Sequence, residues 1–390
     1  MSERADAVVI GAGILGASVA HFLTKRGFGQ VALVDKGAVC SGSTRYSAAN
    51  VRQHYSNEVG IRLAVRAVEM FERDEEELGG PSGFVRCGYL VMAPHGEEQA
   101  IRDVVPLQRS LGVETVILSP AELAERYGEI DVEGVALACL EPRSGYADPA
   151  RTTRSLVDSA RSLGLEVHEG REVTGIERRN GAVAGVRTSA GDIATPVVVN
   201  AAGPWGDRVG RLAGIEFELT FSREHEAQLE LPPGFGEIPV TSDAVQRFYF
   251  RRHGPDRILV GEGWPKEVEP DDPETYDAGT DDDHVEPMLE KLFRRLPSLR
   301  DRVRYVTGYS GMYDITGDWY PIVGPEEELD GYYAAFGGSG HCFKLGPPLG
   351  EALAAVIAGE EPAIDIAPLR RARFAEGDTH SSVWGPGNRA

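Results

Sequence analysis

The segment from Ala5 to Lys36 constrains this chain more than any other. An apolar strand, Ala7–Ile10, leads into three glycines with the spacing G-x-G-x-x-G, and an apolar-periodic helix follows them. A second strand, Val31–Val34, then ends at an acid, Asp35. This order of strand, glycine turn, helix, strand and acid predicts a βαβ unit that binds a dinucleotide.

Each part of this unit has a physical role. Gly11 permits the tight turn, Gly13 lets the backbone approach a pyrophosphate, and Gly16 lets the helix pack closely on the strand. The helix N-terminus offers free N–H groups and a positive dipole end to phosphates. Asp35 is placed to hold ribose hydroxyls and would repel a 2′-phosphate, which argues against NADP. The motif alone does not distinguish FAD from NAD.

Bulk properties exclude several classes of protein. A length of 390 residues suits a large core in two interleaved domains. A net charge of −21 opposes nucleic-acid binding. The start MSERAD has no apolar signal segment, and no apolar run approaches the length of a membrane span, so we expect a cytoplasmic protein. The four cysteines show no metal-ligand spacing, so the sequence predicts reduced thiols and no metal site.

The rest of the chain departs from a simple NAD dehydrogenase, in which βαβ units would continue after Asp35. A Ser/Gly/Thr-rich loop, Cys40–Asn50, and a long helix come next. A hairpin turned at Asn180-Gly181 precedes a buried strand, Val197–Asn200, of the kind found in parallel sheets. The acidic stretch Glu267–Asp283 is predicted to be a solvated loop.

Four separated segments, in a fixed order, carry a resemblance to a known family. They are the opening fingerprint, VVVNAAGPWGDRV (197–209), GYSGMYDITGDWYPIVG (308–324) and GGSGHCFKLGPPLGE (337–351). Together they resemble the D-amino-acid oxidase superfamily of FAD enzymes, and within it the sarcosine oxidase (beta subunit) and glycine oxidase-like branch. The last segment is similar to the family's Gly-His-Gly-Phe-Lys stretch.

The resemblance implies an α/β fold with two domains. One is a discontinuous Rossmann-like FAD-binding domain, and the other is an α+β substrate domain built on an antiparallel sheet. The expected boundaries are 1–80, 145–215 and 320–370 for the FAD-binding domain, 81–144 and 216–319 for the substrate domain, and 375–390 for a polar tail.

FAD is therefore the expected cofactor. The residues predicted to bind it are Gly11, Gly13, Ile14, Gly16, Asp35, Lys36, Ser43, Thr44, Arg45, Val173, Ala202, Gly203, Trp205, Gly311, Gly338, Gly340, His341 and Lys344. Amides at the second Gly-rich strand-to-helix junction would face the flavin N1–C2=O and stabilise its reduced form. Some family members attach flavin through a cysteine at the position of Gly311, so non-covalent FAD is expected here.

The resemblance also places the substrate. Arg52 and Lys344 match the family's carboxylate-holding pair, and a desolvated carboxylate needs such paired cations. Tyr249 and Tyr313 align with positions that line the family's pocket, which completes the predicted catalytic set. Arg45 competes with Arg52 for the substrate role and could instead lie over the FAD phosphates. His54 and His341 are the histidines nearest these motifs, and Thr316 and Asp318 are expected to shape the loop beside the flavin.

The implied reaction is oxidation of the C–N bond of a small amino acid or N-alkyl amino acid of the sarcosine, glycine or D-amino-acid type. Hydride passes to flavin N5, and water hydrolyses the imine. The family's oxygen-promoting lysine is replaced here by Leu259, so oxygen or another electron acceptor remains open. The alternatives are a dehydrogenase or demethylase subunit of a larger complex, and a non-catalytic FAD-binding subunit. The oligomeric state and exact substrate also stay open.

Overall fold

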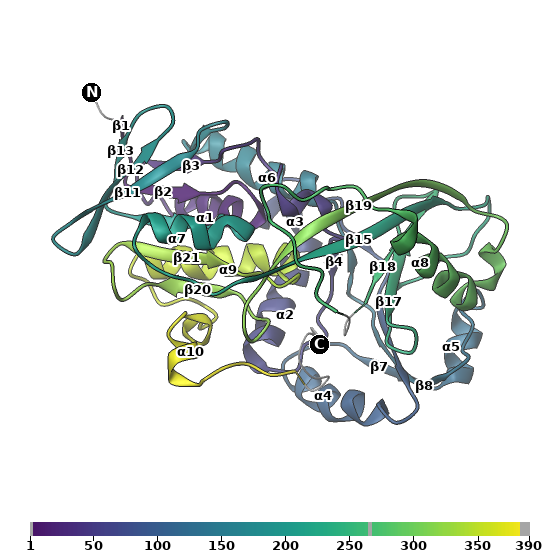
Figure 1. Cartoon of the computed structure of the whole chain (residues 1–390). Helices are drawn as coiled ribbons and strands as arrows, with labels where there is room; N and C mark the ends of the chain where they lie inside the picture. The colour runs from purple at the N-terminus through teal and green to yellow at the C-terminus, as the bar shows by residue number, and fades with distance from the viewer. Residues whose placement is uncertain (1–2, 264–266, 383–390) are drawn as a thin grey trace.

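The computed structural model describes residues 3–263 and 267–382. Two large sheets dominate it, one mostly parallel and one mostly antiparallel. In Figure 1 the long strands β15 and β19 run from the half that holds the parallel sheet into the half that holds helices α5 and α8. The expected α/β class is confirmed.

The parallel sheet has six strands in the order β10-β3-β2-β14-β21-β20. Their bounds are β10 Glu166–His168, β3 Val31–Val34, β2 Ala7–Ile10, β14 Val198–Asn200, β21 Tyr332–Phe336 and β20 Ile322–Pro325. Every neighbouring pair is parallel except β20 with β21. Segments far apart in the sequence thus meet in one sheet, as the buried strand around Val198 predicted.

Strand β2 is buried on both faces, which is why it reads as a continuous apolar run. Ala7 and Val9 join the core under helices α1 and α9, whereas Val8 and Ile10 face the core shared with Phe217. Four helices lie in the half of the molecule that holds the parallel sheet. They are α1 Ile14–Lys25, α2 Glu58–Glu72, α6 Pro149–Ser162 and α9 Cys342–Ile357. Among the described helices, none is both long and apolar enough to cross a membrane.

The second large sheet has eight strands in the order β19-β15-β18-β17-β16-β6-β8-β7. Its strands are β19 Arg304–Ile315, β15 Thr220–Glu230, β18 Arg257–Glu262, β17 Phe248–Arg252, β16 Val240–Asp243, β6 Tyr89–Pro94, β8 Val135–Glu141 and β7 Val116–Leu118. All neighbours are antiparallel except β16 with β6. Helices α4 Glu98–Ser110, α5 Pro120–Arg126 and α8 Asp282–Arg295 accompany it.

Smaller elements complete the described chain. They are the sheet of β1 Glu3–Arg4, β13 Ile193–Ala194, β12 Ala182–Thr188 and β11 Val173–Arg179, the sheet of β4 Asn50–Val51, β9 Gly145–Tyr146 and β5 Val85–Arg86, and helices α3 Asp74–Glu77, α7 Gly206–Leu212 and α10 Arg373–Glu376. The predicted division into two domains stays a prediction. Of the predicted polar tail, residues 383–390 lie outside the described part. His380, within the described part, donates its backbone N–H to Asp318 Oδ2 at 3.1 Å.

Candidate active site

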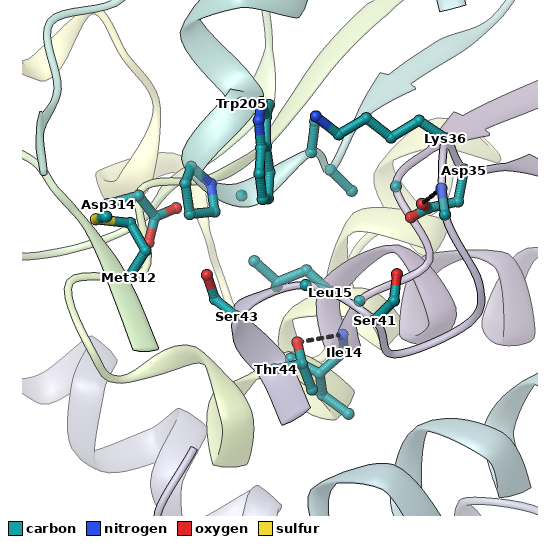
Figure 2. A pocket seen from close by; sticks show the side chains of 18 of the residues that line it. Ile14, Leu15, Asp35, Lys36, Ser41, Ser43, Thr44, Trp205, Met312 and Asp314 are labelled. Atoms are coloured by element: carbon teal, nitrogen blue, oxygen red, sulfur yellow. Dashed lines mark hydrogen bonds between the residues drawn. The ribbon is translucent and has the colours of Figure 1, made fainter. Parts of the chain in front are cut away.

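A cavity of about 860 Å³ lies at the carboxyl ends of β2 and β3. Ligands of open parallel sheets bind at this edge. Its walls come from the turn before α1, the end of β3, the short helices Ser43–Tyr46 and Gly203–Trp205, strand β19 and the turn before α9. Figure 2 shows labelled residues from the start of α1, the end of β3, the two short helices and β19 around the opening. The volume falls within the range of cofactor sites, about 300–1,000 Å³.

Asp35 is fixed at the edge of this cavity by two backbone donors. Its Oδ2 accepts from the N–H of Ala12 at 2.6 Å, and its Oδ1 accepts from the N–H of Gly37 at 2.6 Å. An ionised carboxylate has about four lone-pair sites, so both oxygens can still accept from hydroxyl groups. Asp35 therefore lines the cavity with lone pairs left for a ligand, and its binding to ribose stays a prediction.

The glycine turn has the tight geometry that the spacing predicts. Gly11 has φ of +105°, a left-handed value that other residues rarely adopt. A Cβ atom on Gly16 would lie 1.8 Å from the carbonyl oxygen of Gly11, so only glycine fits between the strand and α1. Next to this turn, the N–H of Ile14 donates to Thr44 Oγ1 at 3.1 Å (Figure 2).

The outer rim of the cavity carries charged and aromatic groups. Lys36 Nζ lies 4.2 Å from the centre of the Trp205 ring and donates to both carboxylate oxygens of Glu274, at 2.9 and 3.1 Å. Glu274 also lies 3.0 Å from Arg208 Nη1. Arg45, in contrast, stacks on Tyr46 at 5.1 Å and does not line the cavity.

The inner end is closed by β19 and the turn before α9. Asp314 Oδ2 accepts from the N–H of Gly337 at 2.7 Å, and the Asp314 carbonyl accepts from the N–H of Ser339 at 3.0 Å. Burial raises the pKa of Asp314 to about 6. Asp314 therefore holds the Gly-rich junction, and protonation of its carboxyl changes the charge at that end of the cavity.

A second, smaller pocket of about 120 Å³ adjoins the first. The two share Ser47, Ala48, Tyr313, Gly340 and Phe343 as lining residues. Arg52, Tyr249, His341 and Lys344 line only the smaller pocket. The structure thus brings the four predicted catalytic residues, Arg52, Tyr249, Tyr313 and Lys344, together around one small space.

The two cations share an aromatic support, Tyr55, which is fully buried. The Arg52 guanidinium lies 4.5 Å from the centre of the Tyr55 ring, and Lys344 Nζ lies 5.3 Å from it. Arg52 donates from Nη1 to the carbonyl of His54, and Lys344 donates to the carbonyl of His341 at 3.3 Å. Both cations are more than nine-tenths buried, where charges act strongly on a ligand.

Comparisons with known proteins agree with this geometry. Residues 6–356 match the family model described as "FAD dependent oxidoreductase" (DAO). This chain belongs to the DAO family. It is 30% identical to mouse (Mus musculus) sarcosine dehydrogenase over 98% of this chain and 43% of that protein. It is 27% identical to 4-methylaminobutanoate oxidase (formaldehyde-forming) of Paenarthrobacter nicotinovorans, over 94% of this chain and 45% of that protein.

A solved structure is also similar to this chain along almost the whole length of this chain. The L-proline dehydrogenase of P. horikoshii superposes with a TM-score of 0.90 and 30% identity, over 97% of this chain and 100% of that chain. By contrast, this chain spans less than half the length of the two curated relatives named above. The chain is an FAD-dependent oxidoreductase domain, and the resemblance to the sarcosine and glycine oxidase branch is confirmed.

The DAO-family cavity has the donors that FAD requires. Ser43 Oγ is buried, has no hydrogen-bond partner among the described residues, and points into the cavity in Figure 2. Asp35 supplies acceptors at the other side, and the Gly338–Gly340 turn supplies the start of α9. The residues present therefore fit the phosphate, ribose and ring ends of one FAD molecule.

Most predicted FAD-binding residues line the large cavity. These are Gly11, Gly13, Ile14, Asp35, Lys36, Ser43, Thr44, Val173, Ala202, Gly203, Trp205, Gly311, Gly338 and Gly340. Gly16 instead packs under the turn, Arg45 lies outside the lining, and His341 and Lys344 line the smaller pocket. Direct binding of FAD by each residue stays a prediction.

His54 lies outside both pockets. It is fully buried, lines neither pocket, and has Nδ1 3.5 Å from Glu141 Oε1 and 3.2 Å from Gln108 Nε2. Glu141 also accepts from the N–H of Gln53 at 2.7 Å, so it positions the segment that carries Arg52. This location favours a structural role for His54.

Sequence reasoning missed Glu226 on β15. It lines the large cavity and accepts from Tyr249 at 2.5 Å and from Tyr309 at 2.6 Å. Burial raises the pKa of Glu226, whereas the two tyrosine hydrogen bonds lower it. The alternation of acids in SREHEA could have placed Glu224 and Glu226 on one strand face, but it could not show which face met the cavity.

Leu259, at the position predicted for the family's lysine, is fully buried on β18. It pairs in register with Gln228 and Arg251 and lines neither pocket. No cationic group from this position therefore reaches the cavity.

Proposed function

We propose that this domain oxidises the C–N bond of a small N-alkyl amino acid. The observation that carries the proposal is the convergence of Arg52 and Lys344 in a small pocket that shares walls with the FAD cavity. Two buried cations favour a carboxylate, because opposite charges attract strongly where water is excluded and charge-assisted hydrogen bonds are strong. The limited volume, about 120 Å³, favours a small substrate.

Tyr249 has a definite hydrogen-bonding role in this pocket. Its single proton goes to Glu226, so its oxygen faces any further partner only as an acceptor. An amine N–H can donate to that oxygen, while the two cations disfavour a charged ammonium close by. The pocket thus orients a carboxylate at one end and a neutral amine near Tyr249. FAD, when bound, supplies the chemistry that accepts the electrons.

The names of the relatives support a secondary amine. Sarcosine, 4-methylaminobutanoate and L-proline each combine a secondary amine with a carboxylate, and proteins named for them resemble this chain. Glycine and D-amino acids, which were also predicted, are primary amines. We therefore place the N-alkyl class first.

Anaerobic reduction of the flavin tests the proposal. The holoenzyme is mixed with sarcosine, L-proline, glycine, D- and L-alanine, and with N-methylethylamine, which lacks a carboxylate. We expect rapid bleaching with the N-alkyl amino acids and none with N-methylethylamine. Bleaching by the carboxylate-free amine at an equal rate would refute the roles of Arg52 and Lys344. A flavin that no compound bleaches would point to the non-catalytic alternative.

A dehydrogenase that uses an acceptor other than oxygen is the second candidate. The buried, apolar Leu259 favours it, since no lysine of β18 lies at the cavity. Stopped-flow mixing of the reduced protein with air-saturated buffer and with an artificial quinone separates the two. Reoxidation by oxygen within one turnover time would identify an oxidase instead.

The proposed partners follow from the small cationic pocket and from the absence of a lysine on β18. The substrate is a small carboxylate-bearing amine, and the acceptor is oxygen or a redox partner. Oligomeric state and partner subunits remain open, and a cytoplasmic location stays a prediction. Size-exclusion chromatography with light scattering tests the first of these.

A further inference from the structure

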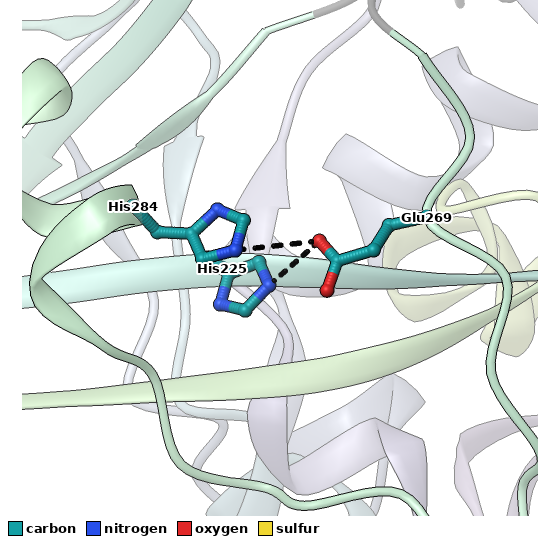
Figure 3. A group of neighbouring side chains, drawn as sticks. All are labelled: His225, Glu269 and His284. Carbon is teal, nitrogen blue, oxygen red and sulfur yellow. Dashed lines mark hydrogen bonds and ion pairs between the residues drawn. The ribbon is translucent and has the colours of Figure 1, made fainter.

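Three potential metal-ligating side chains meet on the side of β15 that faces away from the FAD cavity. Glu224 and Glu226 on β15 line the cavity, so His225 between them faces the other way. Glu269, from the segment before α8, and His284, from the first turn of α8, lie next to it (Figure 3). His225 is 1% exposed, whereas the side chains of Glu269 and His284 are 33% and 27% exposed, so the cluster has one buried and two solvent-accessible members.

The distances match a single-ion site. Glu269 Oε2 lies 3.0 Å from Nε2 of His225 and 3.6 Å from Nε2 of His284. One ligand atom from each residue can be chosen so that all three lie within 4.8 Å of one another. Zn²⁺ binds such atoms at about 2.0–2.2 Å, which separates the ligands of a tetrahedral ion by about 3.5 Å.

The surroundings also suit a bound ion. His225 Nδ1 lies 2.7 Å from Thr280 Oγ1, which can accept a hydrogen bond from Nδ1–H and so leave Nε2 as the ligand atom. Arg223 donates to Glu269 Oε1 at 3.2 Å, which leaves Oε2 toward the histidines. Asp281 Oδ1 lies 3.9 Å from Nε2 of His284 and, with water, can complete the coordination. The two imidazole rings are stacked, with centroids 3.6 Å apart and planes 8° apart, so the rings must tilt for both to direct a nitrogen toward one ion.

We propose that His225, Glu269 and His284 form a binding site for a divalent transition metal of the zinc type. The ion ties the segment 267–281 to β15 and α8. The same segment carries Asp272 and Glu274, whose carboxylates pair with Arg208 and with Lys36 at the rim of the FAD cavity. A metal at this site therefore stiffens one wall of the cavity and slows the loss of FAD. Spacing alone could not reveal it, because the ligands come from distant parts of the chain.

The test uses untagged, full-length holoenzyme that has been treated with a chelator and then titrated with Zn²⁺ in a calorimeter. We expect one saturable site per chain. Glu269→Gln and His284→Asn should weaken zinc binding at least about tenfold, because each removes a ligand. His95→Asn, at an exposed histidine in a turn, is the matched control and should bind zinc as the parent does. Variants of His225 are left out of the test, because replacing this buried side chain can destabilise the fold itself.

Two results would overturn the proposal. The first is no saturable zinc binding by the parent protein. The second is unchanged zinc affinity in both Glu269→Gln and His284→Asn. The link to the cofactor has its own readout, which is the rate of flavin fluorescence increase as FAD is released on dilution. We expect slower release with zinc in the parent and no zinc effect in His284→Asn. Equal release rates in the parent with and without zinc would refute that link.

Discussion

The guanidinium carbon of Arg52 lies 4.5 Å from the centre of the buried Tyr55 ring. The negative face of the ring attracts the cation. Lys344 rests on the same ring at 5.3 Å, and the Tyr55 hydroxyl lies 3.2 Å from Nδ1 of His341. One aromatic side chain thus positions both Arg52 and Lys344, the two cations proposed to bind the substrate carboxylate.

The first prediction concerns the geometry of Arg52. Arg52→Lys keeps the charge but removes the planar fork that matches a carboxylate. We expect kcat/KM for N-alkyl amino acids to fall about 10- to 100-fold, since a hydrogen bond to a charged group contributes about 1.5–3 kcal/mol. Flavin absorbance per chain should not change. Arg62→Lys, on the exposed side of α2, is the matched control. Unchanged kcat/KM in Arg52→Lys would contradict the role.

The second prediction concerns Tyr249. Tyr249→Phe removes the acceptor proposed for the amine and one of the two tyrosine donors to Glu226. We expect kcat/KM to fall about tenfold and the free energy of unfolding to fall by about 1–3 kcal/mol, because the buried Glu226 loses one of its two hydrogen-bond donors. Steady-state kinetics and urea unfolding measure the two effects. Tyr305→Phe, at a residue that is 46% exposed, should change neither. A stability loss with normal kinetics would leave Tyr249 only a structural role.

The third prediction is a pH dependence from Asp314. Burial raises its pKa in the folded chain to about 6, above an ordinary value of about 3.9. The folded state therefore holds the proton more tightly. The resulting stability is fully present below pH about 4 and is lost as pH rises to about 6.

Asp314→Asn removes this titration. The unfolding free energy of the parent, minus that of Asp314→Asn, should fall by about 2–3 kcal/mol between pH 4 and pH 7. Urea unfolding of the cofactor-free chain, the state to which this pKa applies, measures the difference. A difference that stays constant with pH would show that Asp314 titrates normally.

Local sequence patterns predicted the parts of the site that are local in the chain. The turn at Gly11 and the acid Asp35 belong to one contiguous βαβ unit, so spacing alone places them together. Tyr55 could not be found in this way, because its ring meets Lys344 only after α9 packs beside β4. Glu226 depends on which face of β15 meets the cavity, which no pattern within the strand decides.

The acidic stretch 267–283 shows a different limit. Most of it is exposed, as predicted, but Glu269 and Glu274 have fixed cationic or imidazole partners. A run of charged residues in a sequence predicts a solvated loop, because the sequence does not show which distant residues those charges pair with. Those partners, His225 and Lys36, lie on β15 and at the end of β3, and only the tertiary fold brings them close.

The last prediction concerns how FAD is held. The resemblance places Gly311 where some family members attach flavin through a cysteine, and Cys342, which lines the same cavity as Gly311, is a poor nucleophile. Burial, together with Asp314, raises the pKa of the Cys342 thiol, so the reactive thiolate is scarce. We expect acid precipitation to leave all of the flavin in the supernatant, both in the parent and in Cys342→Ser. Flavin that stays with the pellet of the parent but not of Cys342→Ser would show a covalent bond to that sulfur.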